Sequence, residues 1–235
     1  MVQRTGFSTG ALERGNFRKA VSWMESQDIR VLELSALRYE ELRPLMESLN
    51  ELRLSTFTYI SVHAPSSFPR EKEEEVVNLL SHAAERDWNV IVHPNVIYTP
   101  SLWRRLRKYL LIENMDGRKH SGRTAKELEN ILIELPEARL CLDVAHARQL
   151  DTTLTLLWEI VLKFADRIAE VHISELDSLC RHRPMSNGAV CDYRRIAPLI
   201  RADAPVVIES VIESSHSCIR IEEISLAADA FGKSK

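Results

Sequence analysis

The sequence has few glycines, no linker-like segment and no long hydrophobic run. Seven glycines and nine prolines occur in 235 residues, and no Pro/Gly/Ser-rich or low-complexity stretch divides the chain. The length is near that of one α/β barrel, so we expect a single domain over residues 1–235. No apolar stretch approaches the roughly 20 residues that span a bilayer, and residues 1–6 lack the apolar core of a signal peptide. We therefore expect a protein with no membrane partner.

Cysteine is also scarce, and a strong net charge is absent. Cys141, Cys180, Cys191 and Cys218 lie far apart and form no CxxC pair. This spacing favours a reducing compartment over a disulfide framework, so we expect cytoplasmic localisation. The net charge is −3, which makes duplex nucleic acid a less favoured partner.

Short apolar runs alternate with stretches that carry apolar residues at helical spacing. Strands are expected at residues 5–8, 31–34, 59–63, 90–93, 110–113, 140–143, 170–174 and 206–209. Helices are expected at residues 16–26, 39–49, 71–86, 102–109, 124–135, 152–164, 193–201 and 219–230. Near-continuous Val/Ile/Leu runs are typical of parallel strands that are buried on both faces. The alternation predicts an α/β fold, a single (β/α)8 TIM barrel, with an open doubly wound sheet as the alternative.

Six of these runs end in a side chain that can bind a metal ion. The six residues are His63, His93, Glu113, Asp143, His172 and Glu209. A strand that is apolar along its length and polar at its C-terminal tip presents functional groups at the mouth of an α/β barrel. Taken singly, each residue could be a hydrogen-bonded histidine or a carboxylate paired with arginine. Six in series favour a metal-dependent enzyme, with zinc, manganese or iron as the metal that these ligands suit.

Two further histidines follow these runs on the same expected rim. His146 comes three residues after Asp143, where we expect a loop to begin, and His182 follows the seventh run. Because side chains alternate along a strand, Cys141 shares a face with Asp143 one layer deeper, which predicts a packing role for it.

The order of these motifs resembles that of a known superfamily. The segments are Val62-His63-Ala64-Pro65, Val92-His93-Pro94, Ile112-Glu113-Asn114, Leu142-Asp143-Val144-Ala145-His146, Val171-His172-Ile173-Ser174 and Ile208-Glu209. They resemble the xylose isomerase-like TIM-barrel superfamily, which includes endonuclease IV and many sugar-phosphate isomerases and epimerases. The resemblance covers residues 59 to 210. In the isomerases and epimerases, a Glu, Asp, His, Glu set holds one metal, and here that set would be Glu113, Asp143, His172 and Glu209.

Endonuclease IV-like members hold three metals, and the resemblance implies where this chain would hold them. His63 and His93 would join Glu113 at one metal. Glu113 would bridge to a second metal, which Asp143, His172 and Glu209 would also bind. His146 and His182 would hold a third. The family has an Asp two residues before its final His, where this chain has Cys180, so either the thiolate substitutes or the third site is weak or empty. The resemblance implies one to three divalent ions per chain.

Two of the loops expected at the ligand face are basic. Arg118, Lys119 and Arg123 follow the fifth run, and Arg181 and Arg183 follow the seventh. A solvated charged surface is one interpretation. The other is the binding of a small anionic or phosphorylated substrate through guanidinium contacts.

Three activities are compatible with these residues. The first is attack of metal-activated hydroxide on a small phosphoester or other anionic substrate at a multinuclear site, which the additional histidines favour. The second is isomerisation or epimerisation of a sugar or sugar phosphate at one metal, with Glu113 and Glu209 as an acid/base pair. The third is iron-dependent oxidation, for which Cys180 gives weak support. A binding module without catalysis is a further alternative. Glu113 and Glu209 are the predicted catalytic residues.

Overall fold

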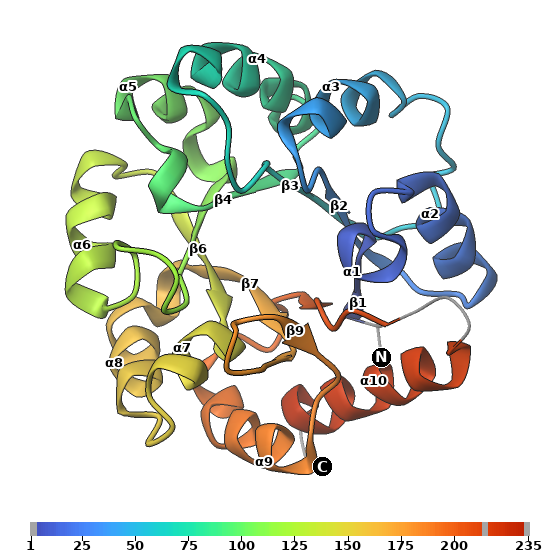
Figure 1. Cartoon of the computed structure of the whole chain (residues 1–235), viewed down its shortest axis with the longest axis vertical. Helices are drawn as coiled ribbons and strands as arrows, with labels where there is room; N and C mark the ends of the chain where they lie inside the picture. Colours follow the sequence, from blue (N-terminus) through green and yellow to red (C-terminus); the bar gives the residue numbers. More distant parts are fainter. Residues whose placement is uncertain (1–3, 213–215, 233–235) are drawn as a thin grey trace.

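Eight parallel strands close into a barrel in the computed structural model, which describes residues 4–212 and 216–232 (Figure 1). The strands are β1 (Thr5–Ser8), β2 (Val31–Ser35), β3 (Tyr59–His63), β4 (Asn89–Val92), β5 (Leu110–Glu113), β6 (Arg139–Asp143), β7 (Ile168–Ile173) and β10 (Val206–Ile208). Each strand pairs in parallel with its neighbours, and β10 closes the ring against β1. The predicted (β/α)8 barrel is confirmed. Residues 1–3, 213–215 and 233–235 of the predicted domain lie outside the described part.

Helices follow the strands and form the outer ring of the barrel (Figure 1). The longer ones are α2 (Phe17–Ser26), α3 (Tyr39–Glu47), α4 (Glu73–Ala84), α6 (Ala125–Glu134), α8 (Thr155–Phe164), α9 (Asn187–Ile196) and α10 (Ser217–Phe231). A short helix, α5 (Pro100–Trp103), continues as the 3-10 segment η3 (Arg104–Tyr109), and further 3-10 turns are η1 (Arg70–Lys72), η2 (Pro94–Val96), η4 (Ala165–Arg167) and η5 (Ala197–Leu199). Within residues 4–212 and 216–232, no helix is both long and apolar enough to cross a bilayer.

Two short helices were not predicted, namely α1 (Thr9–Glu13) and α7 (Val144–Leu150). Helix α7 begins directly at the tip of β6, because the Asp143 carboxylate accepts a hydrogen bond from the backbone N–H of His146 at 2.7 Å and caps the helix. His146 therefore lies in the first turn of α7 and not in a loop, which corrects the prediction.

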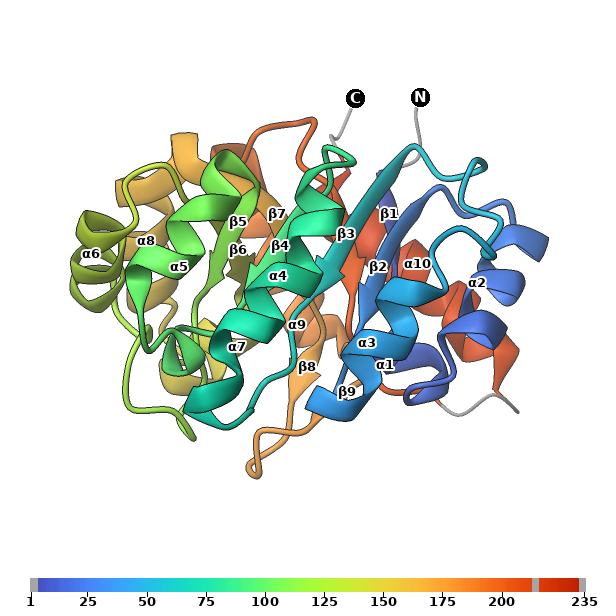
Figure 2. The same cartoon turned by 90° about the horizontal axis from the view of Figure 1, so that it is seen from above.

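A small antiparallel hairpin was also not predicted. Its strands β8 (Glu175–Leu176) and β9 (His182–Arg183) follow β7 and extend beyond one end of the barrel (Figure 2). The Asp177 carboxylate organises the turn, because it accepts hydrogen bonds from the backbone N–H groups of Leu179 and Arg181 at 2.9 and 3.1 Å. The hairpin brings His182 back over the C-terminal end of β7.

The barrel interior is only partly apolar. Most buried aliphatic side chains pack between the strands and the helices. Inside, a separate small cluster consists of Ile91, Leu111, Cys141 and Ala169, so Cys141 packs there. Glu33 and Glu170 are also fully buried. Barrel interiors are usually filled by branched aliphatic residues, so buried carboxylates in this region call for a physical explanation.

Candidate metal centre

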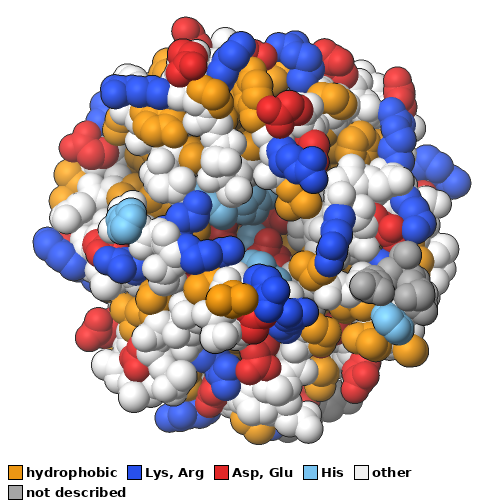
Figure 3. Space-filling model, viewed as in Figure 1, with side chains coloured by type: hydrophobic (Ala, Val, Ile, Leu, Met, Phe, Trp, Pro, Cys, Tyr) orange, Lys and Arg blue, Asp and Glu red, His pale blue; other side chains and the backbone are white. Residues whose placement is uncertain are grey.

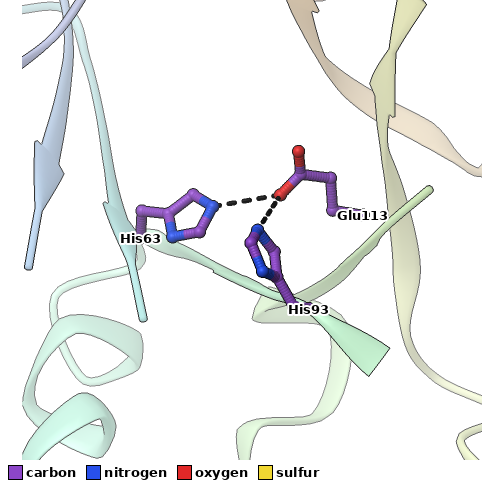
Figure 4. A group of neighbouring side chains, drawn as sticks. All are labelled: His63, His93 and Glu113. Carbon is purple, nitrogen blue, oxygen red and sulfur yellow. Dashed lines mark hydrogen bonds and ion pairs between the residues drawn. The ribbon is translucent and has the colours of Figure 1, made fainter. Parts of the chain in front are cut away.

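Three side chains from neighbouring strands converge at the C-terminal mouth of the barrel. His63 ends β3, His93 follows β4, and Glu113 ends β5. Both histidine Nε2 atoms lie 3.0 Å from the same oxygen, Oε2 of Glu113, as Figure 4 shows. The Nδ1–H of His63 donates to the backbone carbonyl of Ala64 at 2.7 Å, which fixes the ring with Nε2 toward the cluster. The arrangement offers three donor atoms within 4.8 Å of one another.

A second group of donors shares Glu113 with the first. It consists of Glu113, Asp143, His172 and Glu209, again with one donor atom each within 4.8 Å. Nδ1 of His172 lies 3.7 Å from Oε1 of Glu113 and 3.4 Å from Oε2 of Glu209. The two oxygens of Glu113 therefore face different groups, Oε2 the first and Oε1 the second. This is the geometry of a carboxylate that can bridge two cations.

A third group consists of Asp143, His146 and His182. The backbone carbonyl of Asn114 accepts a hydrogen bond from Nδ1 of His146 at 2.8 Å, and Nδ1 of His182 is bonded to the Ser174 hydroxyl at 2.8 Å. The two imidazole rings lie 5.5 Å apart between centroids.

Cys180, which the sequence raised as a substitute ligand, belongs to none of these groups. It is buried and lines a cavity at the C-terminal face of the barrel, and its backbone φ is positive at 54°. Among the described residues, no cysteine is a member of these groups.

The electrostatics of the three groups fit a bound cation. Burial raises the pKa of Asp143 well above its usual value, and the charges of Glu209 and Glu113 raise it further. Burial alone would also raise the pKa of Glu113, but His93, His172 and His63 pull it well below its usual value.

Three ligand-type atoms of the centre are buried without a hydrogen-bond partner among the described residues, namely Asp143 Oδ2, His146 Nε2 and His172 Nδ1. Buried polar atoms without a hydrogen-bond partner and closely spaced buried carboxylates both destabilise the folded protein. A divalent ion would bind the polar atoms and neutralise the carboxylates.

The groups lie at the base of a cavity of about 880 Å³ at the C-terminal face. Figure 3 shows basic side chains around the hollow, with histidine and acidic side chains at its base. The basic residues that line the cavity are Arg14, Arg38, Arg118, Lys119, Arg181 and Arg183. Arg14 and Arg38 were not predicted, because neither lies in a loop that was expected to follow one of the six ligand-bearing strands.

Arg123 was predicted to line the mouth, but it does not line this cavity. Its guanidinium lies 3.5 Å from Oε1 of Glu127, and its backbone N–H donates to Oε2 of the same residue at 2.7 Å. Arg123 therefore pairs with Glu127 in the first turn of α6.

Two carboxylates orient three of the basic residues of the mouth. The fully buried Asp116 accepts hydrogen bonds from the backbone N–H and the Nε of Arg118, at 2.8 and 2.9 Å. Asp177 accepts from Nε of Arg181 at 2.9 Å and from Nε of Arg183 at 3.1 Å. The role of Asp116 was not predicted, although a carboxylate two residues before an arginine in a basic loop was the available signal.

His63 gives the metal-free protein a specific pH dependence. Burial lowers its pKa, but the hydrogen bond to Glu113 and the charges of Glu33, Glu113 and Glu209 raise the pKa to about 9. An unfolded histidine has a pKa of about 6.5. Between about pH 6.5 and pH 9, the folded state therefore binds one more proton at His63 than the unfolded state does. The stability from this group is complete below pH 6.5 or so and is lost as the pH rises through about 9.

We therefore expect the Tm of the chelator-treated protein to fall between pH 6.5 and 9.5, and to fall less steeply in His63→Asn. Scanning calorimetry over pH 6 to 10 measures the difference. Parallel Tm curves for the two proteins would show that His63 does not hold the extra proton.

The fold and the sequence together identify the family. The family model described as xylose isomerase-like TIM barrel matches residues 101–229, and the chain belongs to this family. The predicted resemblance is thus confirmed. A search of curated proteins with this sequence finds no match.

Solved structures show the same fold at low sequence identity. Endonuclease IV from Thermus thermophilus is 17% identical with a TM-score of 0.66, and the match covers 96% of this chain and 99% of that one. The 3-keto-D-glucoside 4-epimerase from E. coli is 12% identical with a TM-score of 0.58, over 97% and 98% of the two chains. A mandelate racemase/muconate lactonizing enzyme from Bordetella bronchiseptica is 10% identical with a TM-score of 0.52, over 87% of this chain and 51% of that one. Identities this low show a shared fold and leave the reaction open.

Proposed function

We propose that this protein is a divalent-metal-dependent hydrolase with a multinuclear site that acts on a small phosphoester or a related anionic substrate. The observation that carries the proposal is Glu113, whose two carboxylate oxygens face two different groups of ligand-type side chains. An endonuclease and an epimerase share the fold, and the donor atoms favour zinc, manganese or iron.

Each group of side chains would hold one ion. The first ion would be bound by His63, His93 and Glu113, the second by Glu113, Asp143, His172 and Glu209, and a third by Asp143, His146 and His182. When bound, such ions supply a Lewis acid for the phosphoryl oxygens and lower the pKa of water so that it can act as a nucleophile at neutral pH.

The side chains of the mouth would bind and orient the substrate. Arg118 and Arg183 are held by Asp116 and Asp177, so their guanidinium groups are oriented before an anion arrives. Glu209 lies at the cavity surface. Burial would raise its pKa, but the charges of His172 and His182 hold it well below its usual value, so Glu209 is ionised and can bind a cation.

The histidines beyond the second group favour hydrolysis over isomerisation. A one-metal isomerase or epimerase needs only Glu113, Asp143, His172 and Glu209. His63 and His93 are buried or nearly so and turn their Nε2 atoms toward Glu113, an arrangement that a single-metal reaction does not require. Multinuclear hydrolysis uses them.

The direct test is hydrolysis of p-nitrophenyl phosphate and bis(p-nitrophenyl) phosphate by protein loaded with Zn²⁺, Mn²⁺ or Fe²⁺. We expect release of p-nitrophenol that requires the metal and stops with a chelator. If protein with two or more bound metals hydrolyses neither ester but interconverts or epimerises sugars, the isomerase alternative would replace the proposal.

Arg183→Ala is expected to raise KM for the phosphorylated substrate by about 10- to 100-fold, with a smaller effect on kcat. The reason is the loss of one charge-assisted hydrogen bond, worth roughly 1.5–3 kcal/mol. Inorganic phosphate should inhibit the wild type competitively and the variant more weakly. Arg123→Ala is the matched control, because Arg123 does not line the cavity. Equal KM values for the two variants would remove Arg183 from the substrate site.

A further inference from the structure

The ring of His172 is oriented differently from those of His63 and His146. In His63 and His146, the Nδ1–H donates to a backbone carbonyl. Nε2 of His63 contacts Glu113 Oε2 at 3.0 Å, and Nε2 of His146 has no hydrogen-bond partner among the described residues. In His172, Nδ1 faces the second group, 3.4 Å from Glu209 Oε2, and Nε2 points into the barrel. Nε2 of His172 therefore contacts groups in the barrel interior, whereas Nδ1 of His63 and of His146 contacts a backbone carbonyl.

Two buried carboxylates lie behind His172. Oε2 of Glu33, on β2, is 2.9 Å from Nε2 of His172, and Oε1 of Glu170, on β7, is 3.4 Å from the same atom. All three side chains have no exposed surface. An ionised carboxylate at such a depth is stable only with a partner.

The two carboxylates differ in how they are held. Both oxygens of Glu170 accept hydrogen bonds from β3, from the Tyr59 hydroxyl at 2.6 Å and the Ser61 hydroxyl at 3.0 Å. Glu33 accepts only at Oε1, from the Ser35 hydroxyl at 2.9 Å. Among the described residues, Oε2 of Glu33 has no hydrogen-bond partner and lies against His172. Glu33 is thus the carboxylate available to His172.

We infer that Glu33 is a positioning residue for the metal centre and makes the His172 group its tightest metal site. This inference rests on the proposed function. Accepting the Nε2–H of His172 would keep the proton on that nitrogen, leave the Nδ1 lone pair toward Glu113, Asp143 and Glu209, and place a negative charge behind the ligand. Carboxylates that back a metal-bound histidine fix its tautomer and raise its basicity.

The two groups of ligands should differ in their affinity for a divalent ion. His63 is backed by a neutral carbonyl and shares its group with His93 and one carboxylate. The His172 group has three carboxylates and a histidine with a carboxylate behind it. A divalent ion should therefore fill the His172 group first and the His63 group second.

The experiment is a titration of chelator-treated protein with Co²⁺ alone, followed by its visible absorption and by competition with a chelating dye. We expect two binding steps in the wild type. Glu33→Gln should weaken the tight step by about 10- to 100-fold and the weak step by less. Glu33→Asp, which keeps the charge, should recover part of the affinity and of the wild-type Co²⁺ spectrum. If Glu33→Gln does not fold, the Asp variant, with its shorter reach, must still show a weakened tight step.

Tyr59→Phe is the matched control, because it removes a hydrogen bond of the same interior network without touching His172. A merely structural role for Glu33 predicts equal metal affinity in the wild type, Glu33→Gln and Tyr59→Phe, and that result would overturn the inference. So would equal loss in both variants. No Co²⁺ binding by the wild type would overturn the proposed function as well. A weakened tight step in a protein that hydrolyses no phosphoester would support the inference and remove only the proposed function.

Discussion

Glu113→Gln should yield a folded protein that binds almost no divalent metal and whose kcat has fallen by more than about 10³-fold. Glu113 faces the His63–His93 pair with one oxygen and His172 with the other. The neutral amide replaces one of those oxygens by an NH₂ group, which cannot bind a cation, and the amide oxygen that remains carries no negative charge. One group of ligands therefore loses its Glu113 donor and the other keeps only a weaker one. Equilibrium dialysis with Zn²⁺ and the phosphoester assay measure the two losses.

The control for this variant is Glu159→Gln, which changes an exposed carboxylate on the outer helix α8. It should keep the metal content and kcat of the wild type. Full metal retention in Glu113→Gln, with its circular dichroism spectrum unchanged, would refute the shared-carboxylate geometry.

His93→Asn should remove one metal equivalent per chain and lower kcat by about 10²-fold, while the His172 group keeps its ion. The reason is that His93 contacts Glu113 Oε2 and takes no part in the second group. His82→Asn serves as the control, because His82 lies exposed on α4 with a side-chain exposure of 62%. Loss of all metal in His93→Asn would show that the two groups do not bind independently, and loss of none would show that His93 is not a ligand.

The strand tips could be predicted from the sequence for a simple physical reason. Parallel strands end at the same face of a barrel, and side chains alternate along each strand. An apolar run that ends in His or Glu therefore fixes both the face and the depth of that residue. Six such tips were named, and the structure brings all six into the ligand groups. Their role as metal ligands stays a prediction.

Other features of the site depend on contacts between distant segments. Glu33 is one polar residue within β2, and its partner His172 comes from β7, so nothing near Glu33 in the sequence points to their pairing. The β8–β9 hairpin has strands of two residues each, too short for a periodic pattern. Arg123 was predicted at the mouth from its position in a basic loop. Its pairing with Glu127 depends on the orientation of its side chain, which the sequence does not show.

The measurement that tests the proposed function most directly is the metal content per chain. The protein is first freed of metal, then reloaded with Zn²⁺ or Mn²⁺ and separated from free ions by gel filtration. Its metal content is measured by inductively coupled plasma mass spectrometry. A multinuclear centre built on Glu113 predicts two or three equivalents per chain, with His63 and His93 required for the second. A single equivalent that His63→Asn and His93→Asn leave unchanged would contradict it and point instead to a one-metal isomerase or epimerase.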